Sequence, residues 1–402
     1  MSAIEPASRT DRRTVTGLSA RPNVEPSEEP EVSPSEVDHD TGLEVEGTDD
    51  LATIERPFDP RKIKVRTITP VVDLILSRIR HGDIDLSPDF QRQAGIWNRE
   101  RMSRLVESLL LRIPIPVFYV AADDDDRWSV VDGIQRITAI DSFVRGRFTL
   151  WRLEYLTQFE TCDYDGLPHS MQRRIKETQL VVNVIEPGTP PEVMFNIFHR
   201  INTGGLPLNG QEIRNALHPG EVRDYLKNLA TTQEFLDATS HSVKPDRMAD
   251  RECVLRFLAF FDSSWNEYED RDLDGYLSQA MRRINEMDDC ERASLARTFT
   301  KAMRAAHCIF GNDAFRKRYD PEDSRKPVSK ALFEAWSVGL AHRSRSEIDH
   351  LVEKREEVKL RFKKLLNEDT EFERAISLST GQPSRVRKRF EAIDELIRAC
   401  IP

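Results

Sequence analysis

The spacing of apolar residues changes at about residue 235, and this change constrains the fold more than any other feature of the sequence. Before it, short runs rich in β-branched residues alternate with helical patterns. After it, apolar residues recur only at helical spacing, as at residues 254–261, 295–303 and 332–340. The sequence therefore predicts a small α+β domain followed by an all-helical domain. Predicted strands cover residues 62–66, 117–122, 128–131, 148–153 and 179–185.

The first fifty residues differ in composition from the rest of the chain. They carry 13 Asp and Glu against 4 Arg, they are rich in Pro and Ser, and they contain few aromatic residues. Such a segment buries too little apolar surface to offset the entropy of ordering. We predict a disordered acidic tail at residues 1–55, an α+β domain at 56–234 and a helical domain at 235–402. A second interpretation makes the tail an acidic lid that competes with nucleic acid for a basic groove.

A short motif lies where a predicted strand gives way to a helix. Residues 128–131 read as a buried strand, and Asp132-Gly133-Ile134-Gln135-Arg136 follows directly. A carboxylate at a strand end, a glycine turn and the free N–H groups of a first helical turn together suit a phosphate and metal site. The structural alternative is that Asp132 only caps the helix and Arg136 only pairs with a carboxylate.

Two more segments carry polar residues between helical patterns. The first reads Asp89-Phe90-Gln91-Arg92-Gln93-Ala94-Gly95-Ile96-Trp97, before a helix at residues 100–112 and an Ile-Pro-Ile-Pro strand at 113–120. The second reads Phe195-Asn196-Ile197-Phe198-His199-Arg200-Ile201-Asn202-Thr203-Gly204-Gly205. A helix to Leu217 then opens at Asn209 with Glu212 three positions later, the pattern of a capping box. Glu212 is either this cap alone or a functional acid.

In this order the three blocks resemble the family that forms the N-terminal part of GmrSD-type modification-dependent restriction enzymes. That resemblance implies a ParB/sulfiredoxin-like fold over roughly residues 60–217. The family's second block usually reads D-G-Q-Q-R, and here Ile134 replaces the first Gln. The departure puts the role of that one side chain in doubt but leaves Asp132, Gln135 and Arg136 in place.

The resemblance implies a nucleotide-binding site assembled from all three blocks. Asp132, Gln135 and Arg136 are the predicted catalytic residues, and Asp132 is also the predicted Mg²⁺ ligand. Arginines would neutralise the phosphates, because a guanidinium binds phosphate oxygens bidentately. The predicted nucleotide-binding residues are Gln91, Arg92, Gly133, Arg200, Asn202, Thr203, Gly204, Gly205 and Glu212.

Three functional hypotheses follow. In the first, the α+β domain binds and hydrolyses a nucleoside triphosphate with Mg²⁺, as a sensor or switch in defence against foreign DNA. The C-terminal half shows no closely spaced His, Asn and Asp set of the HNH type, so a partner polypeptide would cut the DNA. In the second, the protein is a DNA-binding adaptor without turnover, and a basic run at residues 385–389 contributes to the contact. In the third, the pocket is itself a ParB-like nuclease.

The cysteines and the lengths of the apolar stretches indicate where in the cell the protein works. Five scattered cysteines without a C-x-x-C pair argue against a disulfide framework and against a zinc site. No stretch approaches the roughly 20 apolar residues that a membrane-spanning helix needs. We therefore expect a cytoplasmic protein that works on DNA and a nucleotide, away from membranes.

Overall fold

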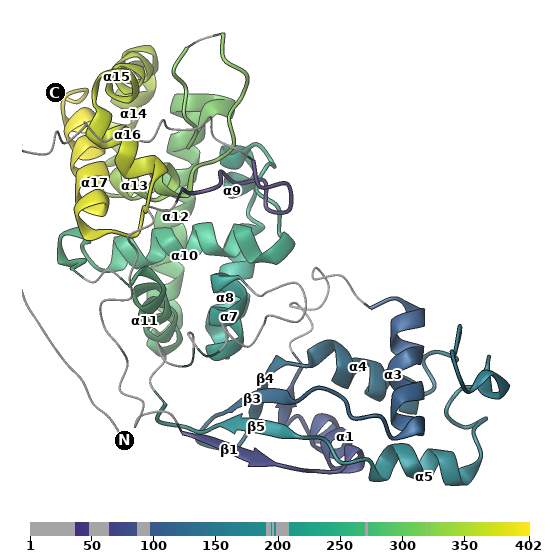
Figure 1. The fold of residues 1–402 in the computed structure, drawn as a ribbon. Coiled ribbons are helices and arrows are strands. Elements are labelled where there is room, and N and C mark those ends of the chain that lie inside the picture. Colours follow the sequence, from purple (N-terminus) through teal and green to yellow (C-terminus); the bar gives the residue numbers. More distant parts are fainter. Residues whose placement is uncertain are drawn as a thin grey trace, which may run out of the picture. The chain divides into compact units, whose positions relative to one another are not determined.

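The structure is a computed structural model that describes residues 37–47, 64–86, 97–189, 194, 197, 209–269, 272–320 and 322–402. Five strands form one mixed sheet in the order β1-β5-β3-β4-β2 (Figure 1). In the centre, β3 runs parallel to β5 and antiparallel to β4. The strands are β1 (Val65–Ile68), β2 (Ile84–Asp85), β3 (Phe118–Ala122), β4 (Trp128–Asp132) and β5 (Val182–Ile185).

The two faces of the sheet are covered by different helices. Val120 and Val130 point to the face that shares one apolar core with α1 (Val72–His81), α3 (Arg99–Leu111), α4 (Ile134–Val144) and α5 (His169–Glu177). Val131 and Ile185 contribute to a smaller cluster with Ile213 of α7 (Gly210–Leu217). This alternation follows from the period of two residues in a strand. The predicted α+β arrangement is confirmed.

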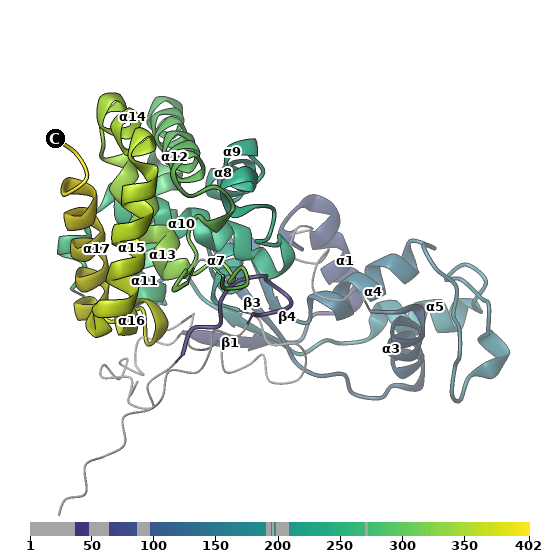
Figure 2. The same ribbon diagram turned by 90° about the horizontal axis from the view of Figure 1, so that it is seen from above.

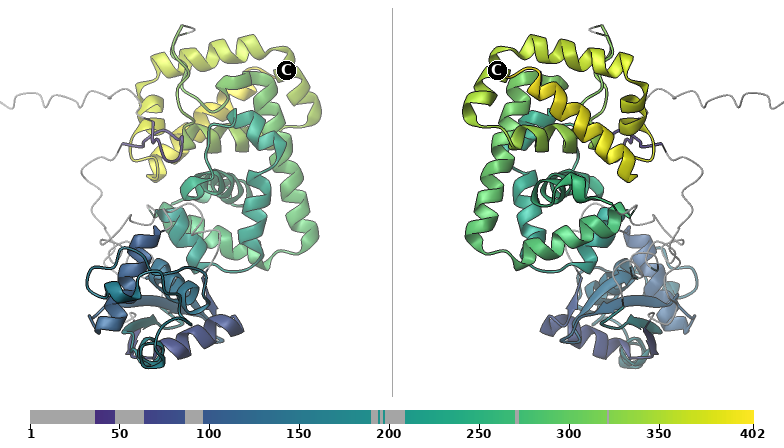
Figure 3. Two further views of the ribbon diagram at one scale, coloured as in Figure 1. Left: turned by 90° about the vertical axis from the view of Figure 1, so that its right-hand side faces the viewer. Right: turned by 90° about the vertical axis from the view of Figure 1, so that its left-hand side faces the viewer.

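The C-terminal part of the chain is helical. Its core is rich in aromatic residues, and the Phe257 and Phe299 rings, for example, lie 5.1 Å apart in an edge-to-face arrangement. Figures 2 and 3 show this region from further directions, with its last helices in yellow. The helices are α8 (Glu221–Ala230), α9 (Gln233–Thr239), α10 (Ala249–Asp262), α11 (Leu273–Glu286), α12 (Asp289–Phe310), α13 (Lys330–Ala341), α14 (Arg345–Glu353), α15 (Arg355–Glu368), α16 (Thr370–Ser377) and α17 (Pro383–Arg398).

Two secondary-structure predictions are corrected. The apolar spacing over residues 346–366 predicts one long charged helix, but the chain there is divided into α14 and α15 at Lys354. Residues 148–153 do not form a strand. Leu150 and Leu153 are buried while Trp151 is exposed, which imitates the alternation of a strand. The backbone there is instead hydrogen-bonded to side chains of α3: Ser103 accepts from the N–H of Trp151 at 2.9 Å.

Residues 37–47, which the sequence places in the disordered tail, pack against the helical region. Leu43 is buried in its core. Glu44 pairs with Lys317 at 2.7 Å, and its N–H donates to the carbonyl oxygen of Val328 at 2.9 Å. A Cβ at Gly42 would lie 2.0 Å from the carbonyl oxygen of Ser242, so only glycine fits there. The structure thus differs from the prediction of disorder over this segment. The average composition of the tail does not show that Leu43 is buried in the helical core or that Glu44 pairs with the buried Lys317.

Candidate functional site

The turn between β4 and α4 requires a glycine. Gly133 has φ of 99°, a conformation that residues with a side chain rarely adopt. A Cβ at this position would lie 2.3 Å from Cδ1 of Phe118 on the neighbouring strand. The absence of a side chain therefore lets α4 start directly above β3. Asp132 is the last residue of β4 and directly precedes this turn.

The side chain of Arg136 is fixed by Asp132, four positions earlier, and by residues at the start of β3. Its Nη2 lies 2.6 Å from Oδ2 of Asp132. Its Nη1 donates to the carbonyl oxygen of Pro116, and its guanidinium carbon lies 4.5 Å from the centre of the Phe118 ring. Burial lowers the pKa of Arg136 below its ordinary value, and the charge of Asp132 opposes this effect. The guanidinium is therefore an oriented positive group with only 10% of the side chain exposed.

Asp132 keeps one carboxylate oxygen for another partner. Oδ2 accepts from Arg136, whereas Oδ1 has no hydrogen bond or ion pair to any residue that the structure describes. The side chain is 32% exposed, so this oxygen can reach a ligand. No side chain caps the N-terminus of α4, where the first N–H groups lack helical partners. One free carboxylate oxygen beside these donors suits a phosphate that carries a divalent cation.

Gln135 connects this turn to the start of α3. Its Oε1 accepts the backbone N–H of Trp97 at 3.4 Å, and Trp97 packs against the core of the sheet domain. Trp97 comes five positions after Arg92 in the sequence. The end of the first block, at Trp97, is thus hydrogen-bonded to Gln135 of the second block, three positions after Asp132.

Seven of the predicted site residues lie outside the described residues, so the convergence of the three blocks stays a prediction. Met194, which precedes the third block, and Ile197, which lies within it, pack against the cluster of Val131 and Ile185. Asn209, which follows the block, begins α7. The predicted residues outside the described part are Gln91, Arg92, Arg200, Asn202, Thr203, Gly204 and Gly205.

Glu212 forms the predicted capping box. Its Oε2 accepts the N–H of Asn209 at 2.7 Å, and the Asn209 side chain accepts the N–H of Glu212 at 2.8 Å. The same Oε2 also lies 2.9 Å from Nη2 of Arg247. Glu212 is 2% exposed. Among the described residues no hydrogen bond or ion pair joins it to Asp132 or Arg136, so the cap is the role that the geometry supports.

Sequence reasoning did not identify two of the groups that build this site. The carbonyl oxygen of Pro116 and the ring of Phe118 both fix Arg136. Both belong to the Ile-Pro-Ile-Pro segment, which the sequence marks only as a strand. No local signal marks Phe118, because it reaches Gly133 only through the pairing of β3 with β4.

The described residues contain no group of three or more His, Cys, Asp or Glu side chains that could hold a metal by themselves. The free oxygen of Asp132 fits a different kind of site. Mg²⁺ is commonly held by one or two carboxylates, with phosphate oxygens and water as the other ligands. Asp132 can therefore act as the protein ligand of an Mg²⁺ ion that arrives with a triphosphate.

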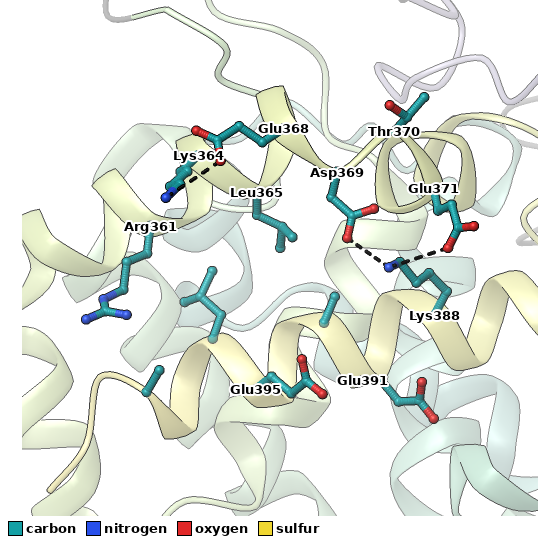
Figure 4. Close-up of a pocket in the computed structure, with 13 residues that line it drawn as sticks. Arg361, Lys364, Leu365, Glu368, Asp369, Thr370, Glu371, Lys388, Glu391 and Glu395 are labelled. Carbon is teal, nitrogen blue, oxygen red and sulfur yellow. Dashed lines mark hydrogen bonds and ion pairs between the residues drawn. The ribbon is translucent and has the colours of Figure 1, made fainter.

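A separate groove of about 750 Å³ lies in the helical region between α15, α16 and α17 (Figure 4). Lys388 crosses it toward Asp369 at 2.8 Å and Glu371 at 3.8 Å. Arg389 is fully buried and paired with Glu334. The predicted basic face at residues 385–389 is therefore wrong for these two residues, whose charges are compensated within the protein.

The site consists of a strand, a glycine turn and a helix start with an oriented Asp–Arg pair, within an α+β domain. Residues 72–219 match the model of the family described as GmrSD restriction endonuclease, N-terminal domain. The match covers the β4–α4 turn and α7, and it confirms the resemblance over this segment. No curated protein matches the chain. In the part of the chain that the structure describes, no helix has the length and apolar character needed to span a bilayer.

Proposed function

We propose that this protein binds a nucleoside triphosphate in its α+β domain and hydrolyses it, as a sensor or switch component of a DNA restriction system. Such a system defends a cell against phage DNA, and a separate nuclease partner makes the cut. The family match over residues 72–219 carries this proposal. It is supported by the Asp132–Arg136 pair at the N-terminus of α4, because that arrangement suits a phosphate with its cation.

Each described residue has a distinct part in the proposed site. The N–H groups of the first turn of α4 donate to phosphate oxygens. Arg136 holds Asp132 in one orientation and adds positive charge, since its donors already contact Asp132 and the start of β3. Gln135 orients a water or a phosphate while it stays linked to Trp97. Gly133 lets the phosphate approach the backbone.

The proposed cation has one role. When bound, Mg²⁺ would neutralise charge that develops on the triphosphate, and Asp132 would hold it. The residues outside the described part complete the proposal as phosphate-binding groups. These are Gln91, Arg92, Arg200 and the turn from Asn202 to Gly205.

Calorimetric titration of the full chain with ATP, GTP, CTP and UTP, with Mg²⁺ or with EDTA, tests the proposal. We expect one triphosphate to bind, with higher affinity in Mg²⁺. Phosphate release is then measured alone and with modified and unmodified DNA. If no triphosphate binds and none is hydrolysed, with or without modified DNA, the proposal fails and a DNA-binding adaptor replaces it.

A further inference from the structure

The segment Thr149–Leu156, here called the α3-side loop, is attached along the length of α3. Arg99 Nε donates to the carbonyl oxygen of Thr149 at 2.8 Å. One helical turn further on, Ser103 Oγ accepts the N–H of Trp151 at 2.9 Å. After another turn, Glu107 accepts N–H groups of the end of the loop. Residues 99, 103 and 107 share one side of the helix, so the loop runs alongside it.

Glu107 fixes the conformation of this loop. Its two carboxylate oxygens accept the N–H groups of Glu154 at 3.0 Å, Tyr155 at 2.7 Å and Leu156 at 2.7 Å. Burial by itself would raise the pKa of Glu107, but these three backbone hydrogen bonds outweigh it and hold the pKa below its ordinary value. The carboxylate therefore stays ionised inside the protein and does not offer its charge to a partner. The loop is ordered before any partner binds.

The side chains that this ordered loop presents are large and exposed. Trp151 is 43% exposed and Tyr155 is 66% exposed, so both count among the exposed large hydrophobic residues that the structure describes. The Arg152 guanidinium lies 5.1 Å from the centre of the Trp151 ring. Arg152 also has φ of 54°, an unfavourable conformation for a residue with a side chain. A buried carboxylate and a strained backbone thus fix two partly exposed aromatic rings at the surface.

The charges around these rings are positive. Residues 97–112 and 145–156 contain seven arginines and three glutamates, although the whole chain has a net charge of −10. One of the glutamates is the internal Glu107. Glu100 pairs with both Arg104 at 3.0 Å and Arg152 at 3.2 Å, so one carboxylate faces two guanidinium groups. Arg101 is exposed on α3. A partner for this surface must carry negative charge and flat groups that stack on aromatic rings.

We propose that the Arg–aromatic surface formed by Arg99, Arg101, Arg104, Trp151, Arg152 and Tyr155 binds DNA at a position where a base is unpaired. The arginines contact phosphates, and an unstacked base lies on the Trp151 or Tyr155 ring. This inference rests on the proposed function, which makes DNA the partner. It adds the surface of contact and the form of DNA that the surface prefers.

This surface is continuous with the candidate nucleotide site through the first turn of α3. The N–H of Trp97 binds Gln135, whereas Arg99, two positions later, binds Thr149 of the loop. The first turn of α3 therefore links the α3-side loop to the side chain of Gln135. We expect DNA that occupies the surface to change the rate of triphosphate hydrolysis.

Fluorescence anisotropy of the full chain with labelled DNA tests the surface. Three probes of one sequence are compared: single-stranded, duplex, and duplex with one unpaired base. We expect tighter binding to the probes with unpaired bases. Trp151→Ala should weaken binding to these probes by about five-fold to a hundred-fold and leave duplex binding nearly unchanged. Arg101→Ala should lower the slope of log affinity against log salt by about 0.7 for the single strand.

Arg355→Ala on α15 is the matched control, because Arg355 is also exposed on a helix. It should leave affinity and salt slope unchanged, and an equal loss in this variant would overturn the proposal. Unchanged binding in both Trp151→Ala and Tyr155→Ala would also overturn it, as would a protein that binds none of the probes. Glu107→Gln provides an independent test: it keeps every exposed side chain but should weaken single-strand binding, because the loop loses its ionic anchor.

Triphosphate titration of the same variants separates this inference from the proposed function. Trp151→Ala and Arg101→Ala should bind triphosphate as the unmodified protein does. Loss of triphosphate binding in a folded Trp151→Ala protein would mean that Trp151 does not act on DNA alone and would overturn the assignment. If no triphosphate binds to the unmodified protein while Trp151→Ala still loses DNA, the proposed function fails and the DNA surface stands.

Discussion

Glu334 and Arg389 form an ion pair in which neither side chain has exposed surface. Arg389 Nε lies 2.8 Å from Oε1 of Glu334, and Nη1 of Arg256 lies 3.3 Å from Oε2. One carboxylate from α13 thus compensates two cations, one from α10 and one from α17. Because a buried charge without a partner is costly, the three helices depend on one another through this residue.

Glu334→Gln should therefore lower the free energy of unfolding by about 3–5 kcal/mol, because it leaves the buried guanidinium of Arg389 without its counter-charge. Arg256 loses one carboxylate partner but keeps Glu252 at 3.0 Å. Urea denaturation measures this change. Glu357→Gln is the control: it removes an exposed ion pair with Arg361 at 2.8 Å and should cost less than about 1 kcal/mol. Equal losses in the two variants would show that burial of the Glu334 pair has no energetic consequence.

Gly133→Ala should destabilise the protein through both a strained backbone and a collision with Phe118. Gly82→Ala separates the two causes, since Gly82 has φ of 80° but an added Cβ would meet nothing within 4 Å. We expect about 1–2 kcal/mol of lost stability for Gly82→Ala from the left-handed conformation. Gly133→Ala should cost about 1–3 kcal/mol more because of overpacking. Thermal or urea unfolding compares the two, and similar losses would mean that the Phe118 contact relaxes at no cost.

Asp132→Asn should change triphosphate affinity in opposite directions with and without the cation. In EDTA the substitution removes a negative charge beside the phosphates, so affinity should stay equal or rise. In Mg²⁺ the substitution removes the proposed ligand, so affinity and hydrolysis should both fall. Calorimetry under both conditions measures these changes, and the same sign in both would remove the cation from the proposal.

Arg136→Ala should reduce triphosphate affinity by about ten-fold to more than a hundred-fold, because the phosphates lose a nearby positive charge and Asp132 loses the charged hydrogen bond that orients it, which contributes about 1.5–3 kcal/mol. It also frees the charge of Asp132, which then repels the phosphates. The double variant Asp132→Asn, Arg136→Ala should therefore bind more tightly in EDTA than Arg136→Ala alone. An Arg136→Ala protein that is folded by circular dichroism and binds triphosphate normally would contradict the proposed role.

The stability of the protein should fall between pH 6.5 and 4 because of His218. Burial, followed by the charges of Arg282, Arg214 and Arg223, lowers the pKa of His218 to about 4. An unfolded histidine takes up its proton near pH 6.5. As the pH falls through this window, the unfolded chain binds a proton that the folded chain does not, so the free energy of unfolding decreases, by about 3 kcal/mol in total. His218→Gln should show a flatter profile of stability against pH over this range, and identical profiles would refute the assignment.

The β4–α4 turn and the α7 capping box could be predicted because their determinants are local. Asp132 and Arg136 are four positions apart on a helix start, and Asn209 and Glu212 have the spacing of a cap. Phe118 could not be assigned to the site, because the register of β3 against β4 brings it under Gly133. How the first and third blocks lie against Asp132 stays a prediction.

Other predictions were wrong because distant partners decide the outcome. The alternation of residues 148–153 resembles a strand, yet the N–H of Trp151 donates to Ser103 of α3, 48 positions away in the sequence. Arg389 lies in a basic run that suggests an exposed face, but Glu334, 55 positions away, draws it into the core. Nothing in either local sequence reveals these partners.

The packing of residues 37–47 has a practical consequence for truncated versions of the protein. A shortened chain that begins at residue 56, where composition places the domain boundary, or at residue 72, where the family match begins, lacks Leu43 and Glu44. The core of its helical region then has a cavity where Leu43 packs in the full chain. Lys317, whose side chain is 4% exposed, loses the Glu44 carboxylate that lies 2.7 Å away. A truncated protein should therefore begin before Asp38. If the C-terminal helical region is produced alone, residues 37–47 should be added as a separate peptide.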